Sequence, residues 1–193
     1  MLFRSFGSKI EDVKKQGIEV IIALDVSNSM LAEDIQPNRL TRAKQAISRL
    51  VDDLDNDKIG LIVFAGDAYT QIPVTTDYVS AKMFRSSIGP EMVPKQGTSI
   101  GAAISLGMRS FTPGEDKSKA MIIITDGENH EDDPVAAADE ASKAGIIIHT
   151  IGIGSEQGVP VPVVRSGKRD FLKDIEGNTV ITKIGRASCR ERV

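Results

Sequence analysis

The sequence lacks tryptophan, contains a single cysteine, and has aromatic residues at only 4% of its 193 positions. The lone Cys189 cannot form an internal disulfide, and it has no neighbouring thiols with which to build a cysteine-based zinc site. Cys189 lies in a polar, basic stretch, residues 185–193, which has no periodicity and is typical of a vector-derived extension. We therefore expect one domain over residues 1–184.

Long hydrophobic runs and a strong charge of one sign are also missing. The longest apolar runs, such as residues 20–24 and 121–124, are far shorter than the roughly 18 to 20 residues that cross a bilayer. Residues 1–7 lack the cationic start and apolar stretch of a signal peptide. The formal net charge of -3 argues against a nucleic-acid partner. These absences predict a soluble globular chain.

Apolar runs alternate with helical periodicities along most of the sequence. The apolar runs predict strands over residues 18–25, 58–65, 69–74, 120–126 and 146–151, with 58–65 and 69–74 paired as a hairpin. The helical spacings predict helices over residues 38–54, 77–88, 98–111 and 134–144. This order predicts an α/β fold with a doubly wound, mostly parallel sheet flanked by helices. A Gly177-Asn178 turn signal predicts a small terminal hairpin over about residues 159–184.

Polar residues follow the predicted strands where a parallel sheet binds ligands, beyond its carboxyl end. They are Asp25, Ser27, Ser29, Thr98 and Asp126. Carboxylates and hydroxyls without histidine or cysteine suit Mg²⁺, or alternatively Mn²⁺, rather than zinc. Alternate side chains of an extended stretch share one side, so the first three could face one ion. The simpler alternative is that the hydroxyls cap helices and the carboxylates end strands.

The Asp-x-Ser-x-Ser spacing at Asp25, Ser27 and Ser29, with Thr98 and Asp126 in order, resembles the metal-ion-dependent adhesion site of von Willebrand factor A (VWA) domains. The resemblance covers residues 17–154 and implies the VWA, Rossmann-like fold. It also implies that the hydroxyls bind a metal ion, that the two aspartates act directly or through water, and that an acidic residue of a protein partner completes the coordination. VWA domains usually end with a further strand and helix, so we expect these to be truncated here and an exposed sheet edge to remain.

Several longer stretches resemble the Bat (aerotolerance-operon) branch of bacterial VWA proteins: residues 29–35, 37–40, 42–44, 64–68, and 125–128 with 130–132. That resemblance implies an inner-membrane protein whose anchors lie outside this sequence and whose VWA domain is extracytoplasmic. It also implies MoxR-type AAA+ ATPases or other Bat proteins as partners.

Two functions fit these residues: a metal-dependent protein-interaction module and a Mg²⁺-dependent phosphohydrolase with Asp25 as nucleophile. Such enzymes carry a second aspartate two residues later and a phosphate-binding lysine. This sequence has Ser27 instead, and Lys95 is the nearest cation to Thr98. We therefore expect no enzymatic activity.

Three other features have a structural and a functional interpretation. The acidic run over residues 128–133 suits helix caps better than a second metal site. Met30 and Leu31 suit either packing or a recognition rim. His149, inside an apolar run, suits a strand histidine better than a catalyst.

Overall fold

The computed structural model describes residues 17–83, 88–114, 117–129, 132–165 and 168–185. Its central sheet has the order β3-β2-β1-β4-β5. The strands are β1 (Glu19–Asp25), β2 (Lys58–Phe64), β3 (Ala68–Thr75), β4 (Lys119–Thr125) and β5 (Ile146–Gly152). All neighbours pair in parallel except β3, which pairs antiparallel with β2. The predicted doubly wound, mostly parallel sheet is thus confirmed, including the hairpin at its edge.

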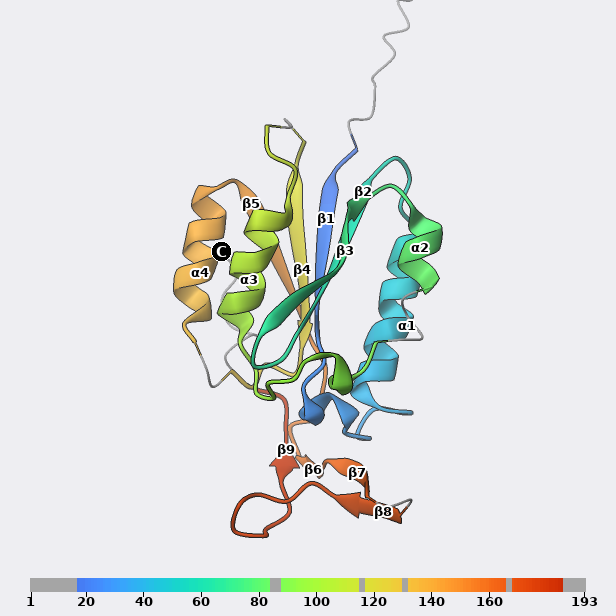
Figure 1. Cartoon of the computed structure of the whole chain (residues 1–193), viewed down its shortest axis with the longest axis vertical. Coiled ribbons are helices and arrows are strands. Elements are labelled where there is room, and N and C mark those ends of the chain that lie inside the picture. Colours follow the sequence, from blue (N-terminus) through green and yellow to red (C-terminus); the bar gives the residue numbers. More distant parts are fainter. Residues whose placement is uncertain (1–16, 84–87, 115–116, 130–131, 166–167, 186–193) are drawn as a thin grey trace, which may run out of the picture.

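Helices cover both faces of the sheet (Figure 1). They are α1 (Arg39–Asp52) and α2 (Tyr78–Met83) on one face, and α3 (Ile100–Ser110) and α4 (Pro134–Lys143) on the other. Successive side chains of a strand point to opposite faces, so β1 supplies both cores. Val20, Ile22 and Leu24 belong to the core that includes Leu40 of α1. Ile21 and Ala23 belong to the core that includes Ile104 of α3. Every residue of β1 is therefore buried.

Side-chain caps define where three of these helices begin. The Asn38 side chain accepts a hydrogen bond from Thr41 N at 2.7 Å, and the Asp77 side chain accepts one from Ser80 N at 3.1 Å. Asp133 accepts hydrogen bonds from two backbone amides of the first turn of α4. Of the predicted helix over residues 77–88, residues 84–87 lie outside the described residues.

Residues 159–185, which we call the terminal lobe, form two small antiparallel pairs where the sequence predicts one hairpin. Strand β6 (Val159–Pro160) pairs with β9 (Ile181–Thr182), and β7 (Pro162–Arg165) pairs with β8 (Lys168–Phe171). The predicted turn has Gly177 at φ +87°, a conformation that glycine adopts without strain. The terminal lobe lies beyond the carboxyl ends of the parallel strands (Figure 1). Residues 186–193 of the predicted extension lie outside the described residues.

Strand β5 forms an exposed edge of the sheet. Ile147 and Ile151 are 58% and 44% exposed, and a groove of about 380 Å³ runs between β5 and α4. His149 is a strand residue, as interpreted, but it is exposed, because β5 is the last strand of the sheet in the part of the chain that the structure describes. No helix among the described residues is long and apolar enough to cross a bilayer.

Candidate metal centre

The first part of the candidate site is the turn that follows β1. Asp25 is the last residue of that strand and is fully buried. Its Oδ1 atom accepts a hydrogen bond from Ser27 N at 2.9 Å, which folds the chain back over the strand end. A short 3₁₀ helix, η1 (Asn28–Leu31), follows and places Ser29 Oγ 2.9 Å from Ser27 Oγ. The structure therefore brings these three predicted residues together.

The second carboxylate, Asp126, follows β4, the strand paired directly with β1. Asp126 is fully buried, and its Oδ1 atom accepts a hydrogen bond from Glu128 N at 3.3 Å. Burial, followed by the charge of Asp126, raises the pKa of Asp25 from 3.8 to about 7, although hydrogen bonds from Ser27 and Thr125 oppose the change. Two buried carboxylates that repel one another in this way favour a bound cation.

The loop before α3 places Thr98 at the same end of the sheet. Thr98 is buried, and the next residue, Ser99, donates its backbone N–H to Ala65 O at 2.7 Å. Ala65 directly follows β2, the other neighbour of β1. The predicted helix over residues 98–111 begins at Ile100 instead, so Thr98 lies in the loop.

The acidic run after β4 supplies caps for two helices, as interpreted. Asp133 caps α4, and Asp132 Oδ2 accepts hydrogen bonds from Ala102 N at 2.8 Å and from the Ser99 hydroxyl. Glu128 instead accepts a hydrogen bond from Lys183 N of the terminal lobe. His130 and Glu131 lie outside the described residues.

Two further observations define the chemistry of this end of the sheet. Met30 is fully buried in the core, so it packs and does not form a rim, whereas Leu31 is half-buried. In the part of the chain that the structure describes, no three His, Cys, Asp or Glu side chains are grouped to hold a metal ion. An ion here would depend on hydroxyl oxygens and water as well as on the two carboxylates.

Arg39, which sequence reasoning missed, is the central cation of this site. Its guanidinium is fully buried and donates to both carboxylate oxygens of Asp34, each at 2.9 Å. Its Nη1 atom also donates to Asp126 Oδ2 at 2.9 Å and to Thr182 Oγ1 at 3.1 Å. One signal was present in the sequence: a basic residue in the first turn of a helix opposes the helix dipole and therefore calls for another explanation.

These contacts determine the charge of the buried group formed by Asp25, Asp34, Asp126 and Arg39. Burial would raise the pKa of Asp34, but its hydrogen bonds and charge interaction with Arg39 hold that pKa below the usual value. Burial would lower the pKa of Arg39, but the same contacts raise it. When all three carboxylates are ionised, Asp25, Asp34 and Asp126 carry three negative charges against the one positive charge of Arg39, an excess of two negative charges. A divalent cation would neutralise it.

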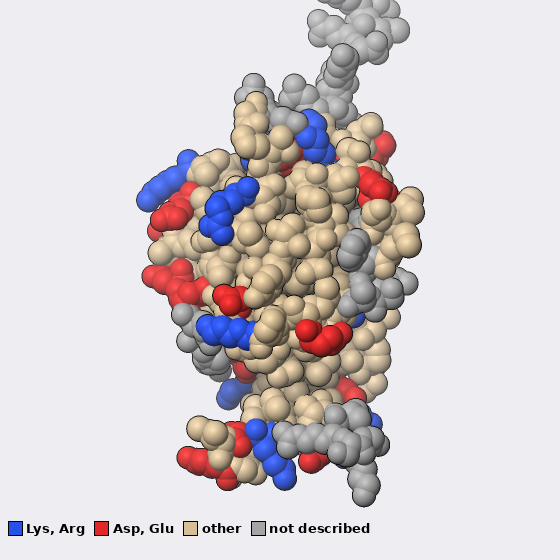
Figure 2. All heavy atoms as spheres, viewed as in Figure 1, with Lys and Arg blue, Asp and Glu red and all other residues tan. Residues whose placement is uncertain are grey.

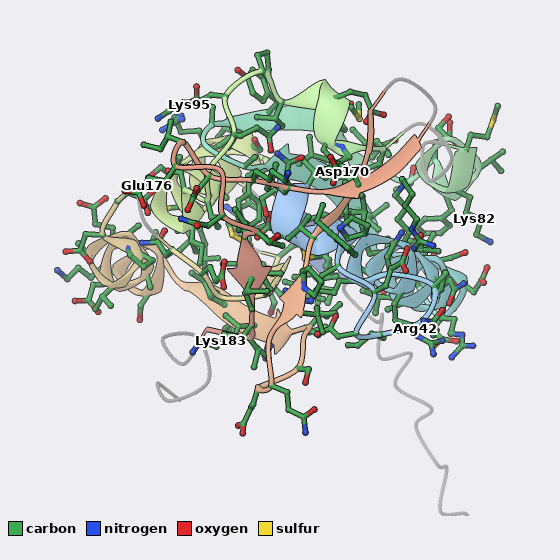
Figure 3. The ribbon with its side chains drawn as sticks, turned by 90° about the horizontal axis from the view of Figure 1, so that it is seen from below. Arg42, Lys82, Lys95, Asp170, Glu176 and Lys183 are labelled. Atoms are coloured by element: carbon green, nitrogen blue, oxygen red, sulfur yellow. The ribbon has the colours of Figure 1, made fainter. Side chains whose placement is uncertain are left out.

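The terminal lobe crosses this end of the sheet, as Figure 3 shows from below, with Asp170, Glu176 and Lys183 on it. Gly185 N donates to Asp126 O at 2.7 Å, so the lobe contacts the strand end directly. The face seen in Figure 2 carries acidic and basic side chains interspersed, with no extended basic patch.

Comparison with known proteins places these features in a family context. The family model described as von Willebrand factor type A domain matches residues 19–177. The structure resembles BatB, a conserved hypothetical protein from Bacteroides thetaiotaomicron, with a TM-score of 0.86 and 57% identity over 90% of this chain and 83% of that chain. An aerotolerance-related membrane protein from Bacteroides fragilis gives a TM-score of 0.85 and 56% identity over 90% of this chain and 85% of that one.

Curated relatives are more distant and longer. A UPF0353 protein from Mycolicibacterium paratuberculosis is 34% identical over 166 residues, which are 75% of this chain and 49% of the relative. The chain thus spans about half the length of the curated relatives that it matches.

Proposed function

Because this chain belongs to the von Willebrand factor type A domain family, we propose that it is a protein-interaction module whose partner binds through a divalent cation. The ion would be held by Asp25, Ser27, Ser29, Thr98 and Asp126. The observation that carries the proposal is the pair of fully buried carboxylates, Asp25 and Asp126, at the ends of neighbouring strands. When Asp25, Asp34 and Asp126 are all ionised, their charge exceeds that of Arg39 by two negative units. Burying such charges without a counter-ion is costly.

The donor atoms support Mg²⁺, with Mn²⁺ as an alternative. Both ions prefer oxygen ligands, and Mg²⁺ keeps water in its coordination shell. All four carboxylate oxygens of Asp25 and Asp126 already accept hydrogen bonds from the protein. This arrangement suits carboxylates that act through water, while the hydroxyls of Ser27, Ser29 and Thr98 bind directly.

A carboxylate of a protein partner is the ligand that suits this ion. The hydroxyl ligands are neutral, and the two positive charges of the cation balance the two negative charges that Asp25, Asp34 and Asp126 carry in excess of Arg39 when they are ionised. An incoming carboxylate therefore meets a cation that lacks an inner-sphere anion, and it forms a strong charge-assisted contact. Without the ion, the same carboxylate would face the negative charges of Asp25 and Asp126.

The cellular setting follows from the relatives. A similar structure is that of an aerotolerance-related membrane protein. We infer that the whole protein is anchored in the inner membrane of a bacterium by segments outside this sequence, with this domain on the extracytoplasmic side. Its resemblance to Bat proteins makes other Bat proteins and MoxR-type AAA+ ATPases the partner candidates.

A phosphohydrolase mechanism finds no support in the geometry. A carboxylate nucleophile needs an ionised oxygen that can reach its substrate. Asp25 is fully buried, both of its oxygens accept hydrogen bonds, and its raised pKa disfavours the ionised form in the absence of a cation.

Calorimetric titration of chelator-stripped protein with Mg²⁺ and Mn²⁺, and with Zn²⁺ for comparison, tests the proposed site. We expect one saturable site, and about tenfold weaker binding in Ser29→Ala, which removes one hydroxyl ligand. Ser110→Ala is the control, because Ser110 Oγ donates only to Leu106 O within α3. Acetate should bind to the Mg²⁺-loaded protein but not to the stripped one. A folded wild-type protein that binds none of these ions would overturn the proposal.

A further inference from the structure

Arg39 joins three parts of the chain that are far apart in sequence. From the start of α1, its guanidinium contacts Asp34 in the preceding loop, Asp126 after β4, and Thr182 in the terminal lobe. We call these four residues the arginine cluster. All four side chains are buried or nearly so. A buried guanidinium loses its water, so each of its hydrogen bonds to a carboxylate matters for folding and for geometry.

Within the arginine cluster, Arg39 fixes the orientation of Asp126. Arg39 Nη1 donates a hydrogen bond to Oδ2 of that carboxylate, and Glu128 N donates one to Oδ1. The carboxylate therefore cannot rotate freely. Arg39 is itself held in place by the two-pronged contact with Asp34, a planar pairing that lysine cannot reproduce. The carboxylate is therefore oriented before any ion arrives.

The same nitrogen atom of Arg39 binds the terminal lobe. Nη1 donates to Thr182 Oγ1 as well as to Asp126 Oδ2, and Nη2 lies 3.4 Å from Thr182 O. Next to this contact, the backbone N–H groups of Lys183 and Gly185 donate to Glu128 Oε1 and Asp126 O. The segment 182–185 of the lobe and the strand end that carries Asp126 therefore share one hydrogen-bonded network.

We propose that Arg39 is a positioning residue of the metal site, and that it couples ion binding at Asp126 to docking of the terminal lobe. This inference rests on the proposed function. An ion bound near Asp126 changes the interaction of this carboxylate with Arg39, and hence the contact of Arg39 with Thr182. Ion binding then stabilises the docked lobe, and by linkage the docked lobe strengthens ion binding by the same factor. A partner that contacts the lobe would in this way change the affinity of the metal site.

The test compares Arg39→Lys with Arg42→Lys, the same substitution at an exposed position of the same helix. Arg39→Lys keeps the positive charge but loses the fork, so it separates orientation from charge. We expect about tenfold weaker Mn²⁺ binding by calorimetry in Arg39→Lys and no change in Arg42→Lys. Thr182→Val, which removes only the acceptor hydroxyl on the lobe, should weaken Mn²⁺ binding by a smaller factor.

Amide hydrogen exchange provides a readout that a purely structural role of Arg39 would not change. In the wild-type protein, Mg²⁺ should slow exchange at the amides of residues 182–185, and this response should disappear in Arg39→Lys and in Thr182→Val. Exchange that is the same with and without Mg²⁺ in the wild type, or wild-type Mn²⁺ affinity in a folded Arg39→Lys, would overturn the coupling. If Arg39→Lys does not fold, Thr182→Val decides by the same two measurements. Absence of any ion binding by the wild type would instead refute the proposed function itself.

Discussion

The hydroxyl of Thr125 donates to Asp25 Oδ2 at 2.6 Å and so joins the ends of β4 and β1. The same oxygen of Thr125 accepts a hydrogen bond from Gly127 N at 3.0 Å. Thr125 and Asp25 are both fully buried, so neither can replace its partner with water. Thr125 thus holds one proposed metal ligand directly, and it shapes the turn that contains the second ligand, Asp126.

Substituting Thr125 by valine should show this dual role. Valine has a similar shape but leaves Asp25 Oδ2 and Gly127 N without their partner, so we expect a loss of about 1–3 kcal/mol in the free energy of unfolding. Urea denaturation of the metal-free protein measures it. Thr70→Val is the matched control on the exposed edge strand β3 and should change stability very little. Equal stability of the two variants would contradict the role assigned to Thr125.

The stability of the metal-free protein should fall as the pH rises toward neutrality, in a manner that depends on Asp25. The pKa of this carboxyl is about 7 in the folded chain against 3.8 as its ordinary value. The folded state therefore binds the proton more tightly than the unfolded state. The resulting stabilisation is fully present below about pH 4 and is lost by about pH 7, up to a limit of about 4 kcal/mol.

Urea denaturation in chelator at about pH 5 and about pH 8 tests the contribution of Asp25 against the Asp25→Asn variant. The wild type should lose stability relative to Asp25→Asn as the pH rises, because asparagine has no proton to lose. Added Mg²⁺ should restore the wild type at the higher pH but leave the variant unchanged. A difference between the two proteins that does not vary with pH would contradict this assignment.

The two neighbouring caps, Asp132 and Asp133, should differ in their effect on ion binding. Each accepts hydrogen bonds from amides at a helix start, so replacing either by alanine should cost about 1 kcal/mol of stability. Only Asp132 also binds Ser99, the residue next to Thr98. Mn²⁺ calorimetry should therefore show weaker binding in Asp132→Ala and unchanged binding in Asp133→Ala. Equal Mn²⁺ affinities of the two variants would mean that the start of α3 does not influence the metal site.

The exposed edge strand β5 should promote self-association. Among the described residues it is the last strand of the sheet, and Ile147 and Ile151 add exposed apolar surface. We expect Ile151→Lys to reduce concentration-dependent association in sedimentation velocity without loss of stability. Val79→Lys is the control, since Val79 is an exposed residue of α2, a helix that contacts β2, three strands away from β5 in the sheet. An equal reduction in both variants would mean that added charge, rather than β5, is responsible.

Local sequence patterns determined most of the sheet, its helices and the residues placed at its carboxyl edge. The uninterrupted apolar run of β1 requires burial on both faces, and the helical spacing of α1 requires one apolar face. Parallel pairing then places Asp25 and Asp126 on adjacent strand ends. These properties depend on residue order within single elements and on general rules of chain connection, so they could be predicted without coordinates.

Only the tertiary structure decided how the arginine cluster forms and what remains exposed. The partners of Arg39 include residues 87 and 143 positions away, and no local period encodes such contacts. The apolar run of β5 has the same pattern as a buried strand, yet its exposure depends on whether a neighbour pairs with it. Burial of a charge and exposure of an apolar strand are both set by long-range packing, because each depends on which distant segments exclude water from it.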